Sequence, residues 1–192
     1  EDNAEFGYGM TLAQKAIRGR LAEYVEQIAA SDKSSAEMKE ACKNYLDTFD
    51  DSKLNRAATD ALIPELEKAA AAGCELSQKT LKDKDFLAKK SMWIFGGDGW
   101  AYDIGFGGLD HVIASGENVN ILVFDTEVYS NTGGQASKST PIGSVAQFAA
   151  TGKATKKKDL PAIAMSYGYV YVAHVAMGAD YNQCIKAITE AE

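Results

Sequence analysis

The chain has 192 residues, enough for one large domain with a hydrophobic core, and 46% of its residues are hydrophobic. Its formal net charge of −7 disfavours nucleic acid or an anionic membrane surface as a partner. No apolar stretch approaches the roughly 20 residues that a membrane-spanning helix requires. The first residues, EDNAEFGYGM, include no initiator methionine and no signal-peptide pattern, so we expect a piece of a longer polypeptide.

The three cysteines are Cys42, Cys74 and Cys184, and they are widely scattered without any CxxC pair. An odd, dispersed set is typical of reduced thiols rather than of disulfides or a zinc site. The sequence therefore predicts a cytoplasmic or comparable reducing compartment, with no complete iron–sulfur or zinc site in this chain.

Composition changes near residue 90. Residues 1–90 hold 31 charged side chains and 4 glycines, whereas residues 91–192 hold 16 charged side chains and 13 glycines. We therefore expect an N-terminal segment and helical arm over 1–90, followed by an α/β domain over 91–192 that is truncated at its C-terminus.

Apolar residues at helical spacing predict three helices in the arm, over residues 11–28, 35–49 and 54–69. Thr11 is the expected N-cap of the first helix, and Ser34 or Ser35 that of the second. The third helix is predicted to stop at Gly73, and Pro64 to kink it or to split it in two.

The second half alternates between strand and helix patterns. Strands are predicted over residues 92–95, 120–125 and 170–175, and helices over 104–113, 141–152, 159–165 and from 180 onward. Asp159 and Asp180 are the expected N-caps of the last two helices. Such alternation indicates an α/β fold with a doubly wound, mostly parallel sheet covered on both faces. The lysines at 156–158 are expected in a solvated loop.

Two polar clusters follow the first two predicted strands. The motif GGDG contains Asp98, and the motif DTEVYSN contains Thr126, which lies 28 residues further along the chain. A βαβ unit takes about 30 residues, so these positions should lie at the carboxyl ends of neighbouring parallel strands. Open α/β sheets bind their ligands at that edge.

The residue types of these clusters fit magnesium bound to a diphosphate. Mg²⁺ takes six oxygen ligands and usually leaves several of them to phosphate and water. Asp98 can supply one carboxylate oxygen. Thr126 and Val128 can supply a hydroxyl and a backbone carbonyl, and the Asn131 amide oxygen could replace either.

Glycines flank the acidic residue of the first cluster. Gly97 and Gly99 have no Cβ atom, so we expect their backbone to approach the phosphates closely. A helix predicted to start near Asp103 would add its positive end. A Gly-Asp-Gly sequence alone is more often a simple turn, and the spacing to the second cluster strengthens the interpretation.

These motifs resemble a known family. The stretch SMWIFGGDGWAYDIGFGGLDHVIASGENVNILVFDTEVYSNTGGQASKSTP closely resembles the thiamin-diphosphate-binding domain of the pyruvate:ferredoxin (flavodoxin) oxidoreductase family. The sequence TGKATKKKDLPAIAMSYGYVYVAHVAMGAD looks like its continuation, and EDNAEFGYGM resembles the segment that introduces it. GDGWAYDIG and DTEVYSNTGGQ together are highly specific to this family, whereas the helical arm matches in character more than in letters.

The resemblance implies a set of site residues. It assigns Mg²⁺ to Asp98, Thr126 and the Val128 carbonyl. It also places Asn131 beside the diphosphate and the reacting thiazolium ring, which makes Asn131 the candidate catalytic residue. The whole expected cofactor-binding set is Gly97, Asp98, Gly99, Trp100, Thr126, Val128 and Asn131.

The resemblance also implies an activity and partners. We expect oxidative decarboxylation of pyruvate to acetyl-CoA, with coenzyme A as acyl acceptor and with electrons passed through iron–sulfur clusters to ferredoxin or flavodoxin. A homodimer and contacts with other domains of the same chain are also expected. The cluster ligands and the glutamate that activates the cofactor lie outside these 192 residues, so the isolated chain is predicted to be inactive.

Three other interpretations compete with this one. The chain could belong to another 2-oxoacid:ferredoxin oxidoreductase, or it could be a non-catalytic assembly module with a thiamin-type fold. The intact combination of Asp98, Thr126 and Asn131 disfavours the module. A Rossmann-type dinucleotide site is disfavoured because no GxGxxG motif at a strand end precedes an acidic residue about 20 positions on.

Overall fold

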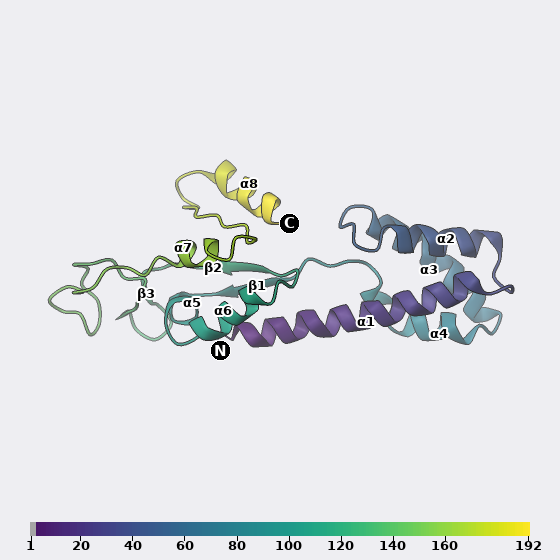
Figure 1. The fold of residues 1–192 in the computed structure, drawn as a ribbon, viewed down its shortest axis with the longest axis horizontal. Helices are drawn as coiled ribbons and strands as arrows, with labels where there is room; N and C mark the ends of the chain where they lie inside the picture. Colours follow the sequence, from purple (N-terminus) through teal and green to yellow (C-terminus); the bar gives the residue numbers. More distant parts are fainter. Residues whose placement is uncertain (1–2) are drawn as a thin grey trace. The chain divides into compact units, whose positions relative to one another are not determined.

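A computed structural model describes residues 3–192 (Figure 1). The chain forms two compact units: a helical unit, Met10–Ser91, and an α/β unit that contains Met92–Glu192 and the described residues up to Gly9. The change in composition near residue 90 therefore lies close to the division between the units. Glu1 and Asp2, the first residues of the EDNAEFGYGM segment, lie outside the described residues.

Helix α1, Ala4–Ala30, begins earlier than expected. The Asn3 side chain accepts a hydrogen bond from the Phe6 backbone N–H at 3.1 Å, as an N-cap does. Thr11, the predicted cap, lies inside the helix and is buried. The predicted start was wrong because the helix has an additional turn at its N-terminus. This turn is held by Ala4, which is fully buried in the core of the α/β unit.

The helical unit continues with α2, Ala36–Asp47, α3, Asn55–Ala71, α4, Glu75–Lys82, and the 3₁₀ helix η1, Lys84–Phe86. Ser35 is confirmed as the N-cap of α2, since its side chain accepts the Met38 N–H at 3.1 Å. The core of this unit combines side chains from the helices and from the chain that follows η1, namely Leu21, Val25, Ile28, Met38, Cys42, Tyr45, Leu62, Leu66 and Leu87.

The predicted split at Pro64 is absent, because α3 runs unbroken from Asn55 to Ala71. Proline lacks the N–H for one helical hydrogen bond, so this helix is held by its packing rather than by propensity alone. Leu62 and Leu66 on either side of the proline are fully buried. Gly73 follows the end of the helix with φ of 92°, as predicted for a residue in the left-handed region.

A buried arginine joins four segments of the helical unit. Arg18 on α1 is 8% exposed, and its guanidinium donates to the carbonyl oxygens of Phe49 at 2.8 Å and Leu87 at 3.3 Å. It also contacts the Asn55 side chain at 3.4 Å. Burial lowers the pKa of Arg18, although the guanidinium remains charged at neutral pH. The charge is thus used to satisfy carbonyl groups at loop ends.

The three cysteines differ in how far their side chains are buried. Cys42 lies in the core of the helical unit, and burial raises the pKa of its thiol to about 11. Cys74 and Cys184 are partly exposed. All three thiols are free.

The α/β unit is built on a parallel pair of strands. Strand β1, Trp93–Gly96, pairs with β2, Asn120–Val123, from Trp93 opposite Asn120 to Gly96 opposite Val123. Helices α5, Asp98–Tyr102, and α6, Phe106–Ala114, form the crossover between them. The predicted βαβ unit is therefore confirmed. The core of the α/β unit consists of Ala4, Ile94, Trp100, Ala101, Tyr102, Leu109, Val112 and Leu160.

One face of this pair is not fully covered. Phe95 is 57% exposed and Phe124 is 44% exposed, and their rings stack at 6.2 Å between centroids. The expected covering of both faces is thus incomplete within the described part of the chain. No helix within residues 3–192 combines the length and the apolar character needed to cross a membrane.

The remaining elements are short. Strands β3, Val128–Tyr129, and β4, Gln135–Ala136, form an antiparallel pair. Helices α7, Leu160–Met165, and α8, Tyr181–Ala191, follow. Their predicted N-caps are confirmed, because the side chains of Asp159 and Asp180 accept backbone N–H groups from the first turns.

Two predicted elements are absent from the structure. The segment expected as a helix over 141–152 is irregular: Phe148 has φ of 64° and is 92% exposed, and Val145 is 73% exposed. An apolar stripe cannot stabilise a helix where it has no surface to pack on. Residues 170–175 are not assigned to a strand, because no neighbouring strand in the described residues pairs with them.

Replacing Arg18 by methionine should lower the free energy of unfolding by about 2–4 kcal/mol, because buried carbonyl groups lose charged donors. Chemical denaturation followed by circular dichroism measures this change. The matched control is Arg56→Met, since Arg56 is largely exposed in a surface ion pair with Asp60 and should change stability by about 0.5 kcal/mol or less. Equal effects of the two substitutions would contradict a central role for Arg18.

Cys42 should be unreactive in the native protein, because its buried thiol stays protonated at pH 8. Titration with an aromatic disulfide reagent should show Cys74 and Cys184 reacting first, and Cys42 reacting only after denaturant is added. Cys42→Ala should remove the slow thiol and leave the fast phase unchanged. Uniform reaction of all three thiols would contradict the burial of Cys42.

Candidate functional site

The ends of β1 and β2 bring two loops together at one edge of the parallel pair. The register places Gly96 opposite Val123, and the Phe124 N–H donates to the Gly96 carbonyl at 2.8 Å. Gly97 and Asp98 follow the first strand, and the loop that contains Thr126 follows the second. Both loops therefore leave the sheet at the same edge, as the sequence spacing predicts.

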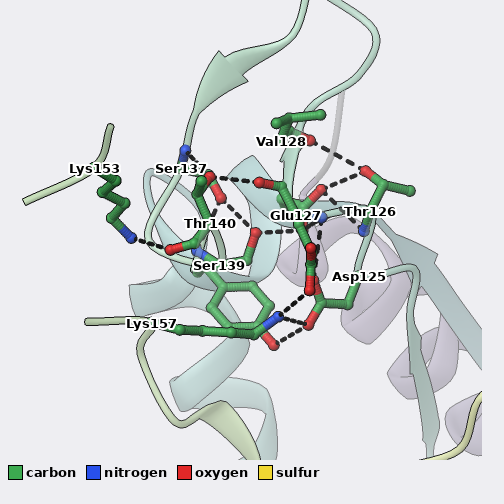
Figure 2. Close-up of polar contacts among 11 residues, drawn as sticks. Asp125, Thr126, Glu127, Val128, Ser137, Ser139, Thr140, Lys153 and Lys157 are labelled. Carbon is green, nitrogen blue, oxygen red and sulfur yellow. Dashed lines mark hydrogen bonds and ion pairs between the residues drawn. The ribbon is translucent and has the colours of Figure 1, made fainter. Parts of the chain in front are cut away.

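The Asp98 carboxylate lies between these loops and is 3% exposed. Its Oδ2 accepts hydrogen bonds from the Thr126 hydroxyl at 2.6 Å and from the Thr126 N–H at 3.3 Å. Its Oδ1 accepts from the Ser139 hydroxyl at 2.7 Å and from the Glu127 N–H at 3.2 Å. The predicted proximity of Asp98 and Thr126 is confirmed, and their role as metal ligands stays a prediction. Figure 2 shows the side chains of Thr126, Glu127 and Ser139 in one cluster of polar contacts.

The Thr126 hydroxyl oxygen lies close to two other oxygen atoms. Thr126 Oγ1 lies 2.6 Å from Asp98 Oδ2 and 3.1 Å from the Val128 carbonyl oxygen. One hydroxyl proton serves only one of these contacts, so the lone pairs of Thr126 and Val128 face each other. Adjacent ligands of an octahedral Mg²⁺ ion lie about 3.0 Å apart, given metal–oxygen distances of about 2.1 Å. The separation of 3.1 Å is close to this spacing, and that of 2.6 Å is somewhat shorter.

The glycines beside Asp98 have different surroundings. A Cβ atom on Gly97 would meet nothing closer than the Phe124 carbonyl oxygen at 4.0 Å. A Cβ atom on Gly99 would lie 2.1 Å from the Tyr129 ring. Gly97 therefore leaves open space in which a ligand could approach the backbone. Gly99 is explained by packing, which differs from the expectation that both glycines serve the phosphates.

The Trp100 side chain belongs to the core of the α/β unit. It is 2% exposed, and its ring fills the space beside Gly96 and Gly105, where added Cβ atoms would come within 3.0 Å of it. The buried Nε1–H has no acceptor among the described residues. This placement argues against an indole that lines the diphosphate.

A short helix that was not predicted, α5, begins at Asp98, and the helix predicted to start near Asp103 is α6, which begins at Phe106. Gly97 is the N-cap of α5, so the backbone N–H groups of Asp98, Gly99 and Trp100 lie in its first turn and have no helical acceptors.

A pocket of about 250 Å³ opens beside the two loops. Its lining includes three of the predicted cofactor-binding residues, Gly97, Thr126 and Asn131. Asn131 is exposed, so its amide is free to meet a ligand at the pocket wall. The complete lining is Phe95, Gly96, Gly97, Phe124, Thr126, Ser130 and Asn131.

A second acidic group beside the site is neutralised by the protein. Asp125 Oδ2 lies 2.5 Å from the Lys157 ammonium and accepts the Tyr102 hydroxyl at 2.8 Å. Burial alone would raise the pKa of Asp125, but hydrogen bonds from Lys157 and Tyr102 outweigh it and hold that pKa below its ordinary value. The same ammonium lies 3.7 Å from the Glu127 carboxylate. The hydrogen-bond donors to Asp98 described above are hydroxyl and backbone N–H groups, without a lysine or arginine among them.

The lysine run is not simply a solvated loop. Lys156 is exposed, but Lys157 is partly buried in the pair with Asp125, and Lys158 donates to the Tyr102 carbonyl at 3.1 Å. Burial, together with the nearby charge of Lys138, lowers the pKa of Lys158. The prediction was wrong because two of these side chains fold back onto α5 and the following loop.

The loop between Asp125 and Val128 turns sharply at Glu127, which has φ of 67°. Such a conformation is unusual for a residue other than glycine and requires support. The Glu127 N–H donates to Asp98, and the Glu127 carbonyl accepts the Thr140 hydroxyl (Figure 2). These bonds hold the turn that presents the Val128 carbonyl to Thr126.

Sequence reasoning missed the hydroxyl groups on the far side of Asp98. Ser137, Ser139 and Thr140 are all buried, and Ser139 reaches Asp98 across 41 positions in the chain. Ser130, 3.4 Å from the Thr126 hydroxyl, also lines the pocket. A cluster of hydroxyl residues after the turn NTGGQ was the only available signal, and local patterns do not reveal a contact over that separation.

Comparison with known proteins gives the same domain. Residues 66–192 match the family described as "Thiamine pyrophosphate enzyme, C-terminal TPP binding domain". The whole chain aligns at 57% identity with pyruvate:ferredoxin oxidoreductase of Moorella thermoacetica and at 55% with pyruvate-flavodoxin oxidoreductase of Klebsiella pneumoniae. It also aligns over its full length, at 43% identity, with a pyruvate dehydrogenase (NADP+) of Cryptosporidium parvum.

The chain spans 17%, 16% and 12% of the length of these three relatives, respectively. The alignments include the helical arm, which the sequence patterns matched only in character. The family match covers well over half of the chain, and it agrees with the parallel strands and the polar edge described above. The chain therefore belongs to the thiamine pyrophosphate enzymes and carries their C-terminal TPP-binding domain.

Proposed function

We propose that this chain is the part of a pyruvate:ferredoxin or pyruvate:flavodoxin oxidoreductase that binds Mg²⁺ and the diphosphate of thiamine pyrophosphate. The observation that carries the metal site is the cluster formed by Asp98 Oδ2, Thr126 Oγ1 and the Val128 carbonyl, with separations of 2.6 and 3.1 Å. The donor set suits Mg²⁺, which prefers oxygen ligands and shares them with phosphate.

Each residue of the site has a role in this proposal. Asp98, Thr126 and Val128 hold the metal, and the open space at Gly97 admits the diphosphate to the backbone of the first turn of α5. Asn131, at the wall of the same pocket, contacts the cofactor near its reacting ring. Bound thiamine pyrophosphate supplies the nucleophilic carbon for cleavage of a 2-oxoacid, and the protein supplies binding, orientation and electrostatics.

The relatives' names support pyruvate as the substrate and ferredoxin or flavodoxin as the electron acceptor. The name of the relative from Cryptosporidium parvum gives NADP+ instead. Proteins that share this domain are therefore named for different electron acceptors. Another 2-oxoacid remains the alternative substrate. Coenzyme A, iron–sulfur clusters bound elsewhere in the protein, a homodimer and a cytoplasmic location are proposed from the family resemblance. The three free thiols suit a reducing compartment.

Asp98→Ala should weaken binding of Mg²⁺ with thiamine pyrophosphate by about 100-fold or more, because outer-shell substitutions already cost 10- to 100-fold. Calorimetric titration of the full-length protein measures this effect, and pyruvate oxidation should be lost in parallel. Asp60→Ala, an exposed acid in the helical unit, is the control and should bind like the wild type. Equal binding by Asp98→Ala would refute the site. A wild type that binds neither ligand would favour a non-catalytic module.

The two glycines beside Asp98 should separate cofactor binding from folding. Gly97→Ala should leave the melting temperature nearly unchanged, because its Cβ has room, but should weaken thiamine pyrophosphate binding by about tenfold, or about 1.4 kcal/mol. Gly99→Ala should instead destabilise the protein by about 1–3 kcal/mol, because its Cβ collides with Tyr129. Thermal denaturation and calorimetry of both variants test this. The proposal loses support if Gly97→Ala binds the cofactor normally.

A further inference from the structure

Ser139 is held in one orientation beside the candidate metal site. Its side chain is fully buried, and its hydroxyl donates to Asp98 Oδ1 at 2.7 Å. Because that proton is committed to Asp98, Ser137 must donate in the 2.5 Å contact between the two serine hydroxyls. The Ser139 N–H in turn donates to Ser137 Oγ at 2.9 Å. The pair of serines thus forms a chain of hydrogen bonds directed at the carboxylate.

The segment that carries Ser139 is fixed at both ends. The Lys138 N–H lies 3.2 Å from both carboxylate oxygens of Asp103, and the Thr140 carbonyl accepts the Lys153 ammonium at 2.6 Å. Thr140 Oγ1 accepts the Ser137 N–H at 2.9 Å and donates to the Glu127 carbonyl (Figure 2). Ser139 therefore cannot easily move away from Asp98.

The two carboxylate oxygens of Asp98 have different hydrogen-bond partners. Oδ1 is occupied by the Ser139 hydroxyl and the Glu127 N–H. Oδ2 accepts the Thr126 N–H and the Thr126 hydroxyl, and that hydroxyl also lies beside the Val128 carbonyl. A cation between Thr126 and Val128 would therefore meet one oxygen of the carboxylate.

We propose that Ser139 is a positioning residue that makes Asp98 a single-oxygen ligand and thereby favours Mg²⁺ over Ca²⁺. This inference rests on the proposed metal site. The two oxygens of one carboxylate lie too close together to fill two corners of a Mg²⁺ octahedron. Ca²⁺ takes six to eight oxygens at about 2.3–2.6 Å and commonly accepts both oxygens of a carboxylate. The hydrogen bond from Ser139 to Oδ1 therefore disfavours coordination by both carboxylate oxygens, which Ca²⁺ accepts and Mg²⁺ does not.

The test is titration of the full-length protein with Mg²⁺ and, separately, with Ca²⁺, each with thiamine pyrophosphate present. Ser139→Ala should raise the dissociation constant for Mg²⁺ by about tenfold, the lower end of the range for lost outer-shell partners. The dissociation constant for Ca²⁺ should change by about twofold or less, because Oδ1, which then accepts only the Glu127 N–H, can join its shell. A general loss of structure would weaken both ions together, so the ratio of the two constants is the decisive quantity.

Ser77→Ala is the matched control, because Ser77 is equally buried but lies in the helical unit. It should leave both constants unchanged. If Ser139→Ala does not fold, Ser137→Ala must shift the ratio in the same direction, since Ser137 orients Ser139. An unchanged ratio in the folded variant would overturn the inference about Ser139. Normal Mg²⁺ binding by Asp98→Ala would instead overturn the proposed site itself.

Discussion

The candidate site depends on the hydrogen bond of 2.6 Å between the Thr126 hydroxyl and the buried Asp98 carboxylate. This bond joins the loops that leave two adjacent parallel strands, and the strand register of Gly96 opposite Val123 makes it possible. The left-handed turn at Glu127 then brings the Val128 carbonyl to the same hydroxyl. The oxygens of Asp98 and Val128 lie near the Thr126 hydroxyl because the loops after β1 and β2 are held by hydrogen bonds. A ligand would therefore bind to groups that are already in position.

Charge is distributed so that one buried carboxylate remains for a cation. Asp125 and Glu127 flank Thr126, and Lys157 lies within 4 Å of a carboxylate oxygen of each. Asp98, by contrast, is contacted by hydroxyl and backbone N–H groups that carry no net charge. The arrangement suits a divalent ion that must also hold an anionic diphosphate.

Local patterns predicted the features that depend on local physics. The apolar runs gave β1 and β2, and the crossover length placed Asp98 beside Thr126, because both follow from chain geometry. The helix over 141–152 and the strand over 170–175 were wrong, since apolar residues form such elements only where a partner surface exists. The contact of Ser139 with Asp98 and that of Gly99 with Tyr129 depend on tertiary folding, which no periodicity reveals.

The proposed cation would bind between Asp98 Oδ2, Thr126 Oγ1 and the Val128 carbonyl. Anomalous diffraction from crystals of the full-length protein with Mn²⁺ and thiamine pyrophosphate would locate the ion directly. We expect one peak about 2.2 Å from each of these three oxygens, with Asp98 Oδ1 still bonded to Ser139. A peak elsewhere in the protein, or one coordinated by neither Asp98 nor Thr126, would contradict it.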